Sequence, residues 1–149
     1  MAVPFKIVMD CVDPHRLAAF WAAALDYLVE DHSALIRQLL DDGVIKDADA
    51  VTVDGRLGWA AAAAVRDPAA PVDPRSGVGL GGRVLFQAVP EPKTVKNRVH
   101  LDLHVGPEQR PEVVERLTGL GGRVLWEGQQ GPNTWVTMAD PEGNEFCVA

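Results

Sequence analysis

Hydrophobic residues recur along this chain with two different spacings. From Phe5 to Cys11 apolar and polar residues partly alternate, which is the pattern of a half-buried strand. Asp13-Pro14 then provides a typical helix start, with Asp as the N-cap and Pro at the first helical position. Apolar residues follow at steps of three and four: Leu17, Phe20, Trp21, Ala24 and Leu28. That stripe predicts a helix running to about residue 27 with one buried face.

The rest of the chain repeats this order. In the first half the pattern predicts a second short amphipathic helix over residues 32–41, strands over 50–53 and 58–66 joined by an Asp54-Gly55 turn, a Gly- and Pro-rich loop over 67–82, and a strand over 83–89. In the second half it predicts a strand over residues 99–105, a helix over 108–120, and strands over 122–127, 134–138 and 145–148. Each half is therefore a strand, a helix and three strands.

The predicted fold is α+β, built from two tandem βαβββ modules with an extra helix inserted in the first. We expect a single domain over residues 1–149, with modules at about 4–90 and 97–149. The segment GGRVL occurs at residues 81–85 and 121–125. Because it falls at the fourth strand of one half and the second strand of the other, the identity is read as chance.

The amino-acid composition excludes several classes of protein to which the chain could belong. The 149 residues are 47% hydrophobic and 23% charged, which excludes a wholly disordered chain and a small disulfide scaffold. A net charge of −7 disfavours nonspecific binding to nucleic acid or an anionic membrane. Only two cysteines are present, Cys11 and Cys147, and no stretch of 18 apolar residues occurs. We expect reduced thiols, a cytoplasmic location, and neither nucleic acid nor membrane as a partner.

Candidate chemistry lies on the strand expected over residues 99–105. Side chains of a strand alternate between its faces, so His100, Asp102 and His104 share the face opposite the apolar residues of the segment. An aspartate this close can orient a neighbouring imidazole. Either this face is the floor of a site, or it is a solvated sheet face without chemistry.

Three segments carry a family resemblance: KIVMDCVDPHRLAAFW, VLFQAVPEPKTVKNRVHLDL and WVTMADPEGNEFCV. With the duplicated βαβββ order, the chain from Phe5 to Val148 resembles the glyoxalase-like branch of the vicinal oxygen chelate superfamily, which includes glyoxalase, extradiol dioxygenases, and bleomycin and fosfomycin resistance proteins. The insertion over residues 32–53 is less typical of it. The resemblance implies a curved mixed sheet that forms a cup around a small molecule, with helices on the outer face, and a homodimer.

Members of this superfamily commonly bind a divalent metal through one residue from each of four strands. Matching the motifs puts Lys6, Gln87, His100 and Cys147 at those positions. His100 fits the usual ligand type, and Gln87 can coordinate weakly through its carbonyl. Lys6 would repel a cation, and Cys147 binds a metal only as thiolate. The metal that the resemblance implies therefore has an incomplete ligand set.

The resemblance and the strand pattern together give the predicted site. Its catalytic residues are His100 and Asp102, and its ligand-binding residues are Lys6, Asp10, Gln87, His104, Trp135 and Cys147. Two functions stay open. One is a lyase or isomerase that moves a proton beside a carbonyl or vicinal oxygens, with His100 or Asp102 as base and Lys6 as electrostatic stabiliser. The other is a protein of the bleomycin-resistance kind, which binds and sequesters a small molecule without catalysis.

Overall fold

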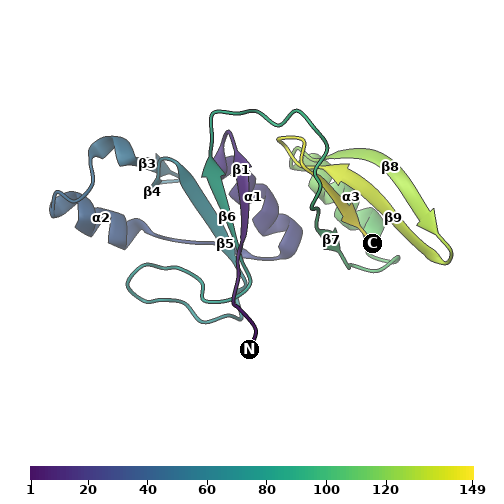
Figure 1. Cartoon of the computed structure of the whole chain (residues 1–149), viewed down its shortest axis with the longest axis horizontal. Coiled ribbons are helices and arrows are strands. Elements are labelled where there is room, and N and C mark those ends of the chain that lie inside the picture. The colour runs from purple at the N-terminus through teal and green to yellow at the C-terminus, as the bar shows by residue number, and fades with distance from the viewer.

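The computed structural model describes residues 1–149 as two four-stranded sheets with the same strand order (Figure 1). The first sheet has the order β1 (Ile7–Cys11), β6 (Arg83–Ala88), β5 (Ala62–Arg66) and β2 (Leu28–Val29). The second has the order β7 (Asp102–Leu103), β10 (Glu145–Val148), β9 (Asn133–Ala139) and β8 (Arg123–Gln130). In each sheet the outer first strand is parallel to its neighbour and the other pairs are antiparallel. The α+β fold of two βαβββ modules is confirmed.

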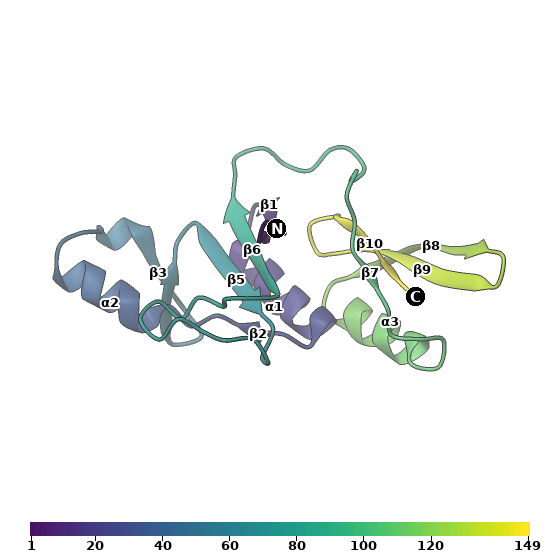
Figure 2. The same cartoon turned by 60° about the horizontal axis from the view of Figure 1, so that its bottom comes forward.

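Each sheet carries one helix of the repeat, α1 (Pro14–Leu25) or α3 (Arg110–Gly119). As predicted, Asp13 caps α1, and its carboxylate accepts a hydrogen bond from the backbone N–H of Arg16 at 3.1 Å. The helix ends at Leu25 because Asp26 adopts the left-handed conformation, with φ of 53°. Figure 2 shows α1 and α3 lying along the same side of the molecule, away from the linker that joins the two modules (residues 89–99).

The two modules meet through α1 and the turn that joins β9 to β10. Phe20 and Trp21 of α1 pack edge-to-face with Phe146, with ring centroids 5.0 Å apart for Trp21 and Phe146. The Trp21 indole N–H donates to the buried Asp140 carboxylate at 3.0 Å. Glu142 accepts hydrogen bonds from the backbone N–H groups of Val12 and Asp13. The modules therefore share one aromatic core, although no hydrogen bond joins their sheets.

The insertion in the first module differs in part from the prediction, because its hairpin is separate from the module's sheet. It contains the expected helix α2 (Ser33–Asp41), the short 3₁₀ turn η1 (Asp47–Asp49), and the hairpin of β3 (Ala50–Val53) and β4 (Arg56–Trp59). That hairpin forms its own two-stranded sheet and supplies no strand of the module. The module's second strand is β2, which was missed because two residues directly after a helix are too short to show a period-two pattern.

The strand predicted over residues 99–105 is also shorter than expected. Only Asp102 and Leu103 form β7, because its single partner β10 pairs with it through Cys147 and Val148. Val99, one of the apolar residues of the predicted segment, lies outside β7 and is 85% exposed. The alternation nevertheless holds, since Leu103 is buried while His100, Asp102 and His104 are exposed on the other face.

The loop over residues 67–82 is fixed to the first sheet by a buried carboxylate. Glu30, which follows β2, accepts hydrogen bonds from Arg83 Nε at 2.7 Å, Arg83 Nη2 at 2.8 Å and the backbone N–H of Gly79 at 2.7 Å. His32 Nε2 lies 2.8 Å from the same carboxylate. Burial alone would raise the pKa of Glu30, but these contacts outweigh it and lower the pKa from 4.5 to about 2. None of the helices has the length and apolar character that crossing a bilayer requires.

Candidate functional site

Three adjacent strands of the second module place polar side chains on one open face. Cys147 of β10 lies opposite Asp102 of β7 on one side and opposite Thr137 of β9 on the other. His100 precedes β7 by two residues and lies on the same face as Asp102. The predicted pair of His100 and Asp102 therefore has a third neighbour, Cys147, on the next strand.

His100 and Asp102 form a hydrogen-bonded dyad. His100 Nδ1 lies 3.0 Å from Asp102 Oδ1, and the two side chains are 41% and 49% exposed. Because the carboxylate accepts a hydrogen bond from Nδ1–H, it favours the tautomer in which Nε2 carries the lone pair. The dyad therefore offers an oriented imidazole nitrogen as a proton acceptor.

The Cys147 thiol is held in its neutral form. Burial is the main cause that raises its pKa above the ordinary value of 9.0. The hydrogen bond with Thr137 lowers the pKa in part, and the neighbouring Asp102 raises it again. Cys147 Sγ lies 3.5 Å from Thr137 Oγ1. A neutral thiol beside the dyad is a poor nucleophile and a poor metal ligand.

These groups line an open hollow of about 1120 Å³. Its walls include Trp126, Trp135, His104 and Arg110. A bulge in β8 between Val124 and Trp126 brings Trp126 opposite Thr137 and into the hollow. The hollow thus combines indole surfaces with a few polar groups, as small-molecule sites do.

Gly128 allows Trp135 to take its place in this wall. The two residues are paired across β8 and β9. A Cβ atom at position 128 would overlap the indole of Trp135 at Cε2, Cζ2 and Nε1. Glycine is therefore the residue that fits under this tryptophan.

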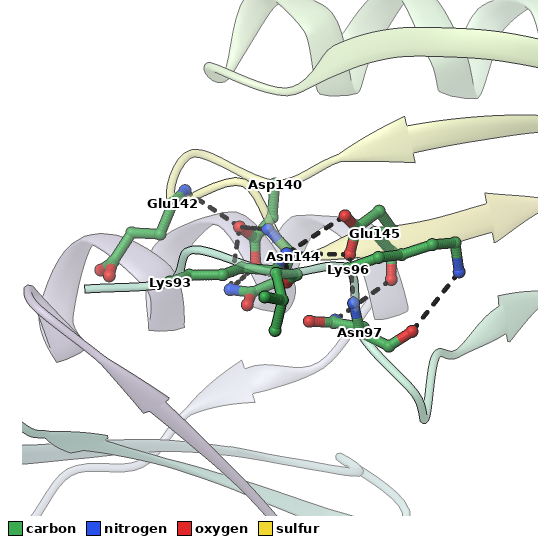
Figure 3. A network of polar contacts seen from close by, with 8 residues as sticks. Lys93, Lys96, Asn97, Asp140, Glu142, Asn144 and Glu145 are labelled. Carbon is green, nitrogen blue, oxygen red and sulfur yellow. Dashed lines mark hydrogen bonds and ion pairs between the residues drawn. The ribbon is translucent and has the colours of Figure 1, made fainter. Parts of the chain in front are cut away.

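The linker between the modules supplies one more wall residue, Lys96, and is held by Glu145 (Figure 3). The Glu145 carboxylate accepts hydrogen bonds from the Lys93 ammonium at 3.1 Å and from the backbone N–H of Asn97 at 2.8 Å. Burial alone would raise the pKa of Glu145, but the contacts with Asn97 and Lys93 lower it. Of the basic residues in the linker, only Lys96 lines this hollow; Lys93 is paired with Glu145, and Arg98 lines the neighbouring space beside β1.

The structure divides the predicted site residues into two groups. It brings together five of them in the hollow of the second module: His100, Asp102, His104, Trp135 and Cys147. The other three belong to the first module: Lys6, Asp10 and Gln87. Asp10 and Gln87 face each other across β1 and β6. Asp10 shares a smaller hollow of about 560 Å³ with His100, between β1 and the linker.

The hollow around the dyad is therefore lined by the second module and the linker. The two similar modules led to the expectation that both halves of the molecule would line it, and the structure differs from that expectation. The reason is that β1 and β7, the outer strands of the two sheets, are not paired with each other. Three wall residues lie outside the predicted set: Lys96, Trp126 and Arg110. Trp126 reaches the hollow through a bulge, and Arg110 through the position of α3, and neither feature leaves a local signal in the sequence.

The donor set does not match the metal site that the family resemblance implies. His100, Asp102 and Cys147 each offer one ligand atom, and these atoms lie within 4.8 Å of one another. Two of the four expected positions belong to the first module: Gln87 lies in β6, and Lys6 precedes β1 and is exposed. The fourth position carries a thiol, Cys147, whose pKa is raised. Hard divalent ions require several oxygen ligands, and zinc requires deprotonated thiolates or several imidazoles. The residues present do not fit that metal, so no step is derived through it.

Comparisons with known proteins agree with this architecture. Residues 6–149 match the family model described as a glyoxalase-like domain. A hypothetical protein from Staphylococcus aureus has a similar structure, with a TM-score of 0.61 and 13% identity over 99% of this chain and 93% of that one. The fosfomycin resistance protein FosX from Listeria monocytogenes, solved with Mn(II) and 1S,2S-dihydroxypropylphosphonic acid, gives a TM-score of 0.59 and 11% identity over 99% and 89%.

A glyoxalase/bleomycin resistance protein/dioxygenase family enzyme from Burkholderia phytofirmans gives a TM-score of 0.57 and 11% identity, over 96% of this chain and 94% of that one. At these identities the similarity concerns the fold. No curated protein matches the chain significantly.

Proposed function

This chain belongs to the glyoxalase-like domain family, and from that premise we propose that it binds a small oxygen-bearing organic molecule in the hollow of its second module. We further propose that the dyad of His100 and Asp102 moves a proton on a carbon beside a carbonyl group. The observation that supports this most directly is the 3.0 Å contact between His100 Nδ1 and Asp102 Oδ1 at the open face of that hollow.

The proposed reaction uses the dyad as a general base. Asp102 keeps the proton on Nδ1, so that Nε2 of His100 accepts the proton of a C–H bond next to the carbonyl. The electron pair of that bond passes into the carbonyl group and forms an enolate. When the carbon that loses the proton also carries a hydroxyl group, the enolate is an enediolate. The hydroxyl proton then passes to the former carbonyl oxygen, and the imidazolium returns its proton to the former carbonyl carbon. The carbonyl and hydroxyl groups thereby exchange places with no net gain or loss of atoms.

Lys96 is the cation that the hollow offers to the enolate oxygen. Lys96 lines the hollow, and its positive charge acts on Cys147, which neighbours the dyad. A positive charge beside the developing oxyanion stabilises it and lowers the barrier. Lys96 takes the role that the sequence suggested for Lys6.

Proton exchange in heavy water tests the reaction directly. Hydroxyacetone and 2-hydroxyacetophenone, incubated with the protein in D₂O, should lose the NMR signal of the protons beside the carbonyl faster than in buffer. His100→Ala should abolish the acceleration, because it removes the base. His15→Gln is the matched control, since His15 contacts the backbone carbonyl of Trp59 in the first module. Exchange at the buffer rate with both ketones contradicts the catalytic proposal.

The second candidate function is binding without turnover. The incomplete metal set favours it, because an enolate then has only Lys96 to stabilise it. Proteins of similar structure include fosfomycin resistance proteins. Saturable binding of either ketone with no proton exchange would support this candidate over the isomerase.

Metal analysis addresses the role of a metal ion. Protein purified without chelator should contain well under one equivalent of Mn, Fe, Ni or Zn by plasma mass spectrometry. A stoichiometric metal that is lost in His100→Ala contradicts the proposal of a metal-independent dyad.

A homodimer is the proposed assembly. The chain exposes 9382 Å². A compact monomer of 16.1 kDa exposes about 7400 Å². The excess surface includes the outer edge of the first sheet, where Val8 is 45% exposed, and the linker at Val99. Light scattering coupled to size exclusion should give a mass near two chains, and a monomer at micromolar concentration contradicts the assembly.

A further inference from the structure

One arginine in the wall of the hollow has a donor without an acceptor, and from it we infer that the ligand of this protein carries a carboxylate or a comparable oxyanion, received by Arg110. The inference rests on the proposed function, because it assumes that the hollow binds a small molecule. It adds the charge of that molecule and the end of the hollow that holds the charge.

Arg110 is the first residue of α3 and lines the hollow beside Trp135. Its Nη1 donates to Thr134 Oγ1 at 2.9 Å. Its Nε is buried and has no hydrogen-bond partner, and it is the one buried side-chain nitrogen or oxygen in the chain in that condition. Leaving such a donor unpaired costs about 1–3 kcal/mol, more when the group is charged.

The guanidinium of Arg110 also lacks a counter-charge. It takes part in none of the ion pairs of the chain. Arg83 shows the contrast, because both its Nε and its Nη2 donate to the Glu30 carboxylate. Arg110 instead keeps its Nε–H unpaired and its charge uncompensated at a wall of the hollow.

A planar oxyanion fits this arrangement. When a carboxylate draws the guanidinium toward the hollow, Nε and Nη2 can donate to its two oxygens, which removes the unsatisfied donor and neutralises the charge. Trp126 and Trp135 also line the hollow and provide indole faces for an aromatic or apolar body. The expected ligand is therefore a small aromatic or apolar acid with an additional oxygen function for the dyad.

Binding of simple probes tests the charge requirement. Benzoate and phenylphosphonate are the anionic probes, and benzamide is the neutral probe of the same shape. We expect both anions to bind at least about tenfold more tightly than benzamide, which is the effect of one charge-assisted hydrogen bond. The Arg110 Nε–H signal in a ¹H–¹⁵N spectrum should shift on titration with either anion.

Two variants separate the outcomes. Arg110→Gln should remove the preference for anions and the Nε–H signal, while Arg123→Gln, an exposed arginine outside the hollow, should keep both. Equal binding of benzoate and benzamide, both weakened by Trp135→Ala, overturns the inference and leaves the proposed binding site standing. Failure of both anions to bind also overturns it. The proposed function fails separately, when the two neutral ketones neither bind nor exchange protons.

Discussion

Replacing Glu30 by glutamine removes the charge at the centre of the contact between β2 and the loop over residues 67–82. The Glu30 side chain is completely buried and holds Arg83, His32 and the backbone of Gly79. Glu30→Gln preserves the shape and some hydrogen bonds. It leaves the Arg83 guanidinium, whose side chain is 11% exposed, without a counter-charge.

The size of the effect follows from the pKa of Glu30. The difference between the ordinary value of 4.5 and about 2 corresponds to about 3 kcal/mol of folding free energy. Because the folded state lowers the pKa, this stability is fully present above pH 4.5. It is lost progressively as the pH falls from 4.5 through 2, and below that pH the carboxyl group is protonated in both states.

Urea unfolding followed by circular dichroism measures this contribution. At pH 7 the free energy of unfolding of Glu30→Gln should be about 3 kcal/mol lower than that of the natural protein, and the difference should shrink as the pH falls below 4.5. Glu115→Gln, at an exposed position on α3, is the matched control and should change little. A difference at pH 7 no larger than that of the control, or one that stays constant down to pH 2.5, refutes the reasoning.

Three further predictions concern the site and the contact between modules. Gly128→Ala should displace the Trp135 indole and weaken benzoate binding severalfold with the circular dichroism spectrum unchanged; unchanged binding would show that this wall is not used. Iodoacetamide should alkylate Cys147 slowly at pH 7 and faster above pH 9, because the pKa of this thiol is raised. Cys11, with a pKa of about 12, should react more slowly still. Rapid labelling of either thiol at pH 7, measured by mass spectrometry, would contradict this prediction. Glu142→Ala should lower the free energy of unfolding by about 1–3 kcal/mol, because two backbone N–H groups lose their acceptor, and a loss below 0.5 kcal/mol would indicate that water replaces it.

Much of the fold could be predicted because its signals are local. The Asp13-Pro14 start and the apolar stripe of α1 depend on neighbouring residues, and the structure contains both. The strand β2 could not be predicted, because its two residues are strand only through pairing with Arg66 and Val65 of β5. The strand conformation of these two residues depends on their pairing with β5, as is common for short strands.

The candidate site was predictable only within one strand. Alternation around β7 placed His100 and Asp102 on one face, and the structure joins them by a hydrogen bond. Which other side chains share the hollow depends on register and on the unpaired edges of the two sheets, neither of which leaves a trace in the sequence. For this reason Arg110 and Lys96 could be identified as wall residues only from the structure.

The turn between β9 and β10 helps to hold the two modules at a fixed angle to each other. Within six residues, the carboxylates of Asp140, Glu142 and Glu145 reach Trp21, the start of α1 and the linker. Rotating one sheet against the other would break these contacts together. Together with the aromatic core that the two modules share, this short stretch of chain thus fixes the angle between them, and shortening it should loosen their mutual orientation.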